Sequence, residues 1–105
     1  NMTLAARPPK AQTVGDLIQL EIQLAAGGTA VDPTSVIFKW IEPSEITVTT
    51  LTYGVDAELV KAAVGIYTVN LSLITDGVYN IRWEAGGDYV GAREHQITVA
   101  PSLFD

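Results

Sequence analysis

The chain reads Gly-Ile-Tyr-Thr-Val-Asn-Leu at 65–71 and, after a short polar turn, Gly-Val-Tyr-Asn-Ile-Arg-Trp at 77–83. Each half opens with Gly-x-Tyr and then places a large apolar side chain at every second position. Successive side chains of a β-strand point to opposite faces, so this period of two predicts strands with one buried face. We expect two neighbouring strands whose inward side chains are Tyr67, Val69, Leu71, Tyr79, Ile81 and Trp83.

Five more strands are expected, because apolar and β-branched runs recur between clusters of glycine, proline and aspartate. The clearest covers 16–24, where four aliphatic side chains alternate with glutamine and glutamate. The other four are expected near 10–14 and at 35–41, 46–53 and 90–99. Residues 57–64 lack a clear period and are expected to form a connector, containing either one helical turn or a short edge strand. Regularly spaced strands without a convincing helix predict an all-β sandwich or barrel.

The turn before Tyr79 resembles the start of strand F in immunoglobulin-like domains, where a tyrosine stands two residues before the second cysteine. Ile81 would take the place of that cysteine, and Ile22 the place of the first one. Trp40, eighteen residues after Ile22, resembles the core tryptophan of strand C. We therefore predict an immunoglobulin-like β-sandwich of about seven antiparallel strands, with Trp40 buried and the Tyr79 hydroxyl bonded to backbone near the preceding turn.

A chain of 105 residues is expected to form one domain, here a sandwich over 13–100 with an N-terminal arm (1–12) and a C-terminal tail (101–105). Two adjacent prolines favour an extended arm. A frayed terminus is the favoured interpretation of the arm, and docking on a neighbouring subunit is the alternative. The candidate partner-binding residues are two bases of the arm and two apolar residues of the tail: Arg7, Lys10, Leu103 and Phe104.

Alternating strand directions should bring the loops 25–33, 53–57 and 85–89 to one end of the sandwich. The candidate binding residues of this loop end are Asp32, Tyr53, Asp56, Asp88 and Tyr89. Three aspartates on converging loops could supply oxygen ligands to a calcium ion. Turn aspartates more commonly bond their own backbone, so this second interpretation is favoured. We predict no metal and no cofactor.

Charge and composition argue against several function classes. Twelve acidic residues against six basic ones give a net charge of −6, which suits neither nucleic acid nor an anionic membrane. The apolar runs are too short to span a bilayer. The one histidine, His95, lies in a predicted strand with no nucleophile or acid beside it on the same face, and it is expected to be a surface or edge residue. A non-enzymatic protein is therefore predicted.

Three segments together resemble small proteins encoded among the head and neck genes of tailed bacteriophages: 31–36, 65–67 and 77–87. They carry Asp-Pro-Thr before a strand, Gly-x-Tyr in the middle and Arg-Trp-x-x-Gly near the end. The resemblance covers most of the chain and implies an immunoglobulin-like structural protein of a phage or prophage particle. Such a protein would decorate the head or join the head–tail connector and bind other virion proteins.

The resemblance also implies a place in the virion, or in the host cytoplasm during assembly, and it leaves homo-oligomer formation in the assembly open. The alternative is an immunoglobulin-like adhesion or spacer module of a bacterial surface protein. That alternative implies a location at the cell surface, surface proteins as partners and a longer parent chain.

Overall fold

The structure is a computed structural model that describes residues 2–6 and 12–101. These residues form strands joined by turns and short loops, with no helix among them. The strands are β1 (Met2–Ala6), β2 (Gln12–Thr13), β3 (Leu17–Ala26), β4 (Thr29–Ala30), β5 (Ser35–Ile41), β6 (Thr49–Thr52), β7 (Leu59–Ala63), β8 (Ile66–Ser72), β9 (Gly77–Gly86) and β10 (Gly91–Ala100).

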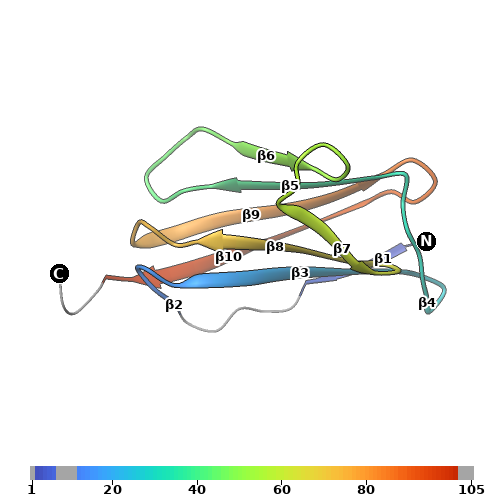
Figure 1. Ribbon diagram of the computed structural model, residues 1–105, viewed down its shortest axis with the longest axis horizontal. Coiled ribbons are helices and arrows are strands. Elements are labelled where there is room, and N and C mark those ends of the chain that lie inside the picture. Colours follow the sequence, from blue (N-terminus) through green and yellow to red (C-terminus); the bar gives the residue numbers. More distant parts are fainter. Residues whose placement is uncertain (1, 7–11, 102–105) are drawn as a thin grey trace.

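Two sheets pack face to face (Figure 1). One has the order β1-β3-β8-β7, with β4 paired to β3, and the other has the order β2-β10-β9-β5-β6. All neighbours are antiparallel except β2 and β10, which pair in parallel over two residues. This order matches strands A-B-E-D in one sheet and G-F-C, extended by a further strand at each edge, in the other. The predicted immunoglobulin-like β-sandwich is confirmed.

The core lies between the inward faces of the two sheets. All six side chains that the two Gly-x-Tyr strands were predicted to turn inward are buried. The rings of Phe38 and Trp83 meet edge to face with centroids 4.7 Å apart. The Thr75 N–H donates a hydrogen bond of 3.3 Å to the hydroxyl oxygen of buried Tyr79. The predicted bond between Tyr79 and the backbone of the preceding turn is therefore confirmed.

Trp40 was predicted to be largely buried, and the structure places it among the partly buried residues that pack against the core. Its ring is half-buried near the end of β5, where it packs against Phe38 with centroids 5.5 Å apart. The central tryptophan position belongs to Trp83 on β9, whose side chain is almost fully enclosed. The physical reason is position along the strand, because Trp40 shares the inward face of Phe38 but lies close to the end of β5.

The expected strand over 46–53 is shorter in the structure, because the chain leaves the turn at 42–45 and joins the sheet only where Thr49 pairs with Trp40. Of the two forms expected for the connector at 57–64, the structure has the edge strand, β7, with a β-bulge between Lys61 and Ala63. The two-residue strand β4 was not predicted.

The predicted arm over 1–12 needs correction. Met2–Ala6 pairs residue by residue with β3, and Leu4 is buried in the core. The prolines at 8 and 9 restrict their own positions and the residue before them, so they leave the earlier residues free to join a sheet. The expected strand near 10–14 is reduced to β2. Arg7 and Lys10, and likewise Leu103 and Phe104, lie outside the described residues.

The two tryptophans provide a test of this core. Replacing Trp83 by alanine is expected to lower the free energy of unfolding by about 3–5 kcal/mol, because a large buried side chain is lost and a cavity remains. Trp40→Ala should cost less than Trp83→Ala, since part of the Trp40 side chain is exposed to solvent. Urea denaturation measures both, and a larger loss for Trp40 than for Trp83 would contradict the assignment.

Candidate interaction surfaces

Two of the three predicted loops, 25–33 and 85–89, lie at the right-hand end of the sandwich in Figure 1, and the third, 53–57, lies nearer the middle. We call residues 27–34, 53–56, 64–65 and 87–90 the loop end. The rings of Tyr53 and Tyr67 pack edge to face here with centroids 5.2 Å apart. The N–H of Asp88 donates a hydrogen bond of 3.4 Å to the hydroxyl of Thr34. Loops that are far apart in the sequence are thus in direct contact.

Asp32 is the polar centre of the loop end. Its Oδ1 accepts hydrogen bonds from the Gly65 N–H at 2.8 Å and from the Tyr67 hydroxyl at 3.1 Å. Its Oδ2 accepts a hydrogen bond of 2.7 Å from the Lys61 ammonium. Asp32 therefore ties the loop before β5 to the β7–β8 hairpin and satisfies a hydroxyl on a buried tyrosine, which would otherwise be costly to bury.

These contacts change the pKa values of Asp32 and Tyr67. The hydrogen bond from Lys61, with the one from the Gly65 N–H, lowers the pKa of Asp32. Burial, assisted by the bond to Asp32, raises the pKa of Tyr67 to about 12. Asp32 is therefore an anion and Tyr67 a neutral donor over the whole physiological pH range.

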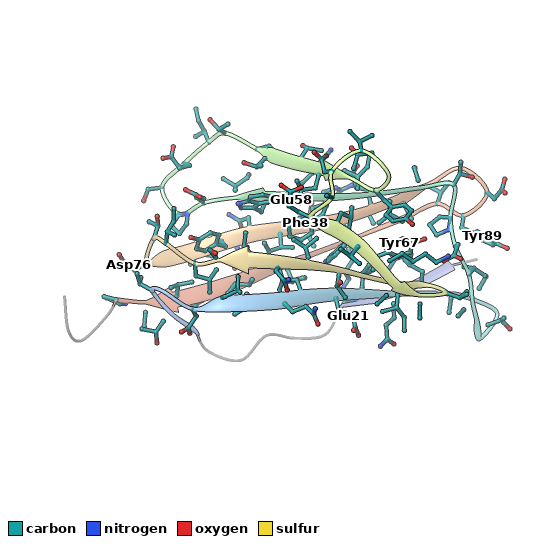
Figure 2. The ribbon with its side chains drawn as sticks, in the orientation of Figure 1. Glu21, Phe38, Glu58, Tyr67, Asp76 and Tyr89 are labelled. Carbon is teal, nitrogen blue, oxygen red and sulfur yellow. The ribbon has the colours of Figure 1, made fainter. Side chains whose placement is uncertain are left out.

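The other loop-end candidates have separate roles. Asp56 Oδ2 accepts a hydrogen bond of 2.8 Å from the Thr52 N–H, so this aspartate caps its own turn. Tyr53 is partly exposed. Tyr89, labelled at the right in Figure 2, is half-buried. Within residues 2–6 and 12–101, no three acidic or histidine side chains are grouped as metal ligands. The carboxylates of Asp32 and Asp56 thus bond backbone, tyrosine and lysine groups, and the loop-end aspartates are not grouped as a calcium site.

We expect Asp32→Ala to destabilise the domain by about 1–2 kcal/mol, because the Tyr67 hydroxyl and the Gly65 N–H lose their acceptor. Asp88→Ala is the matched control, since only the backbone N–H of Asp88 takes part in the bond to Thr34. That variant should change the free energy of unfolding by less than about 0.5 kcal/mol. Equal effects of the two substitutions would show that Asp32 does not join the loops.

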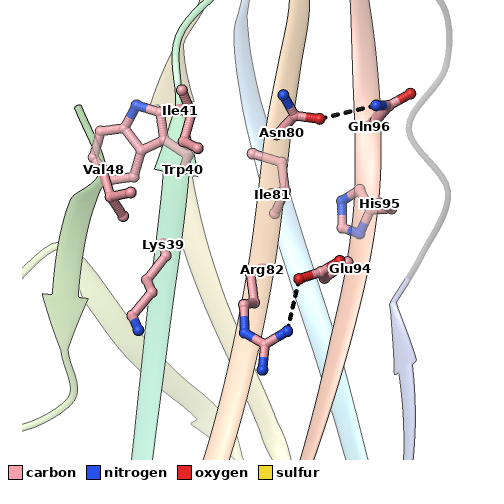
Figure 3. A pocket seen from close by; sticks show the side chains of 10 residues that line it. All are labelled: Lys39, Trp40, Ile41, Val48, Asn80, Ile81, Arg82, Glu94, His95 and Gln96. Atoms are coloured by element: carbon pink, nitrogen blue, oxygen red, sulfur yellow. Dashed lines mark hydrogen bonds and ion pairs between the residues drawn. The ribbon is translucent and has the colours of Figure 1, made fainter. Parts of the chain in front are cut away.

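A shallow pocket of about 410 Å³ lies along β5, β9 and β10 (Figure 3). Its charged side chains are paired: Lys39 Nζ lies 3.0 Å from Glu84 Oε2, and Arg82 binds both Glu84 and Glu94 at 2.6 Å. Gln96 Nε2 donates to Asn80 Oδ1 at 2.9 Å. Arg82 and then Lys39 lower the pKa of Glu84 through these hydrogen bonds. The ion pairs of Glu84 thus favour its anion, which does not suit a general acid near neutral pH.

His95 is half-buried on the inward face of β10, and β2 does not extend beside it, so it lies at an edge of the sheet, one of its two expected places. It is the cross-strand partner of buried Ile81 and shares the inward face of β10 with Ile97 and Val99. Both ring nitrogens are buried without a hydrogen-bond partner among the described residues, as is Nε1 of Trp83. Burial, together with the charge of Arg93, lowers the pKa of His95 below its ordinary 6.5. The imidazole is therefore held neutral.

This burial makes stability depend on pH. The unfolded chain binds the His95 proton at a higher pH than the folded chain does, so its contribution is present above about pH 6.5 and is lost as the pH falls. Asp32 and Glu84 also have lowered pKa values, but their ordinary values of 3.8 and 4.5 place their losses at lower pH. We expect the thermal midpoint to fall between pH 7.5 and 5.5, and less steeply in His95→Leu. Parallel curves for the two proteins would refute this role.

The opposite end of the sandwich was not recognised as a surface from the sequence. It consists of residues 14–16, 42–48 and 73–76 with the adjoining Leu17, and we call it the acidic end. Its three turns contain four carboxylates and no lysine, arginine or histidine: Asp16, Glu42, Glu45 and Asp76. Its exposed large apolar side chains are Leu17, Ile46, Val48 and Ile74. The signal in the sequence is the presence of large apolar residues in the predicted turns, where polar residues are usual.

Comparison with known proteins adds no family to these observations. No protein-family model matches the chain, and the search of curated proteins finds no significant match. The described residues include no helix long and apolar enough to cross a membrane.

Proposed function

We propose that the protein is a non-enzymatic structural component of a phage or prophage particle, which binds other virion proteins as a head decoration or at the head–tail connector. The observation that carries the proposal is the distribution of exposed apolar side chains. Most of them lie at the two ends of the sandwich, and two lie within strands, Val60 on β7 and Val78 on β9. The loop end has Tyr53, Val55, Val64 and Val90, and the acidic end has Leu17, Ile46, Val48 and Ile74. Gathered apolar residues on a small domain suit protein contacts.

The chemistry of the side chains is consistent with a binding role. The pocket carries lysine, arginine and glutamate side chains that already neutralise one another through ion pairs. His95, the residue most suited to proton transfer, has its ring nitrogens enclosed between the sheets. The assignment to a phage particle is supported by the sequence resemblance to proteins encoded among phage head and neck genes.

Particle incorporation is the direct test. A tagged copy expressed during growth of the encoding phage or induced prophage is expected to co-sediment with particles through a density gradient. It should do so at a fixed stoichiometry to the major capsid or connector protein, because a structural component occupies a fixed set of sites. Recovery of all the protein in the soluble fraction, with particles of normal composition, would overturn the proposal.

An adhesion or spacer module of a bacterial surface protein is the second candidate. One observation favours it: Met2 pairs with Ala26 at the loop end, whereas Ala100 pairs with Thr13 near the acidic end. The chain thus enters β1 at one end and leaves β10 at the other, which suits domains joined in tandem. Neighbouring portal, capsid or tail genes would favour the particle, and one long reading frame with a secretion signal and repeated domains would favour the surface protein.

A further inference from the structure

The three turns of the acidic end are fastened into one surface. The Gly15 N–H donates to the Leu73 carbonyl at 2.8 Å, and the Leu73 N–H donates to the Asp16 carbonyl at 2.9 Å. The turn at 42–45 meets the start of β9, where a Cβ added to Gly77 would lie only 2.7 Å from Pro43. These contacts hold the β2–β3 turn beside the β8–β9 turn, and the β5–β6 loop beside the start of β9. In Figure 1 the three turns lie together on the left.

Several large aliphatic side chains of this surface are exposed to solvent. Ile46 is 93% exposed, Ile74 is 68% exposed and Leu17 is 67% exposed. Ile46 follows a tight turn that is closed by a bond of 3.1 Å from the Glu45 N–H to the Glu42 carbonyl. Three large aliphatic side chains in water at one end of a small domain favour contact with another apolar surface.

The charge of the same surface selects the partner. None of its four carboxylates forms an ion pair with a basic side chain of the described part of the chain. Figure 2 shows Asp76 at this end of the molecule. A partner that covers Ile46 and Ile74 must also approach these carboxylates, so lysine or arginine around an apolar depression would complement the surface.

Among the described residues, neither end of a second copy of this chain presents that complement. The loop end also exposes apolar residues, Val55 and Val90, and it also carries carboxylates, on Asp56 and Asp88. Lys61, on β7, is already bound to Asp32 of the loop end. Stacking of copies end to end would therefore place carboxylates against carboxylates and leave them desolvated, which is costly.

We propose that the acidic end is the docking surface for a different protein, whose contact site presents lysine and arginine side chains around an apolar depression. This inference rests on the proposed structural role and adds the chemical character of the protein that is bound. Ile46 and Ile74 would enter the apolar depression. Glu45 and Asp76 would face the basic side chains at its rim, where ionic contacts fix the orientation of docking.

The test compares two matched double variants in the particle co-sedimentation assay. Ile46→Ser with Glu45→Lys alters the acidic end, and Val90→Ser with Asp88→Lys makes the same kinds of change at the loop end. All four positions are exposed, so both variants should keep the thermal midpoint of the original protein within a few degrees. We expect the acidic-end variant to bind particles at least about tenfold less and the loop-end variant to bind as the original does.

Zero-length cross-linking of carboxylates to amines on the same particles identifies the partner residue. The expected product joins Glu42, Glu45 or Asp76 to a lysine of another virion protein. If the original protein sediments with particles and the two variants bind equally, or if the cross-links join two copies of this chain, the docking inference is wrong and the structural role stands. If the original protein does not sediment with particles, both proposals fail.

Discussion

The cross-strand contact between Phe38 and Trp83 is the constraint on which the second sheet depends. The two residues are directly paired between β5 and β9, and their rings meet in the core. A slip of one residue between these strands would turn one ring toward water, because neighbouring side chains point to opposite faces. The same register puts Lys39 opposite Arg82 on the outer face and leaves Glu84 within reach of both. The core contact thereby also arranges the ion pairs of the pocket.

The alternation of large side chains made the central strands predictable. The Gly-x-Tyr strands and 16–24 each have one buried face, so their apolar side chains recur at every second position. The outer strands escaped recognition for different reasons. Met2–Ala6 is short and precedes two prolines. It forms a strand because the edge of β3 is open for pairing, and this edge is a property of the folded sheet that the sequence pattern does not reveal. Trp40 is less enclosed than Trp83 because it lies near the end of β5, and a match by spacing to strand C does not reveal that position.

The surfaces were less predictable than the fold. Asp32 could be selected from its place before a strand, but its role depends on Tyr67 and Lys61, which lie about thirty residues further along the chain. The acidic end draws Asp16, Glu45 and Asp76 from three separate turns, and only the packing of both sheets brings those turns to one end. His95 showed the same difficulty. The alternation along β10 indicated which residues share its face, but it did not indicate how much of the ring is buried.

The opposite placement of Met2 and Ala100 has a mechanical consequence. Tension applied between them would pull β1 along its own length against β3, to which it is joined by five residue pairs. It would pull β10 in the same lengthwise manner against β9, along nine pairs. Antiparallel hydrogen bonds run perpendicular to the strands, so this direction of force loads each row in shear and strains all of its bonds together. The sandwich is therefore built to resist stretching between these two points, whichever assembly holds it.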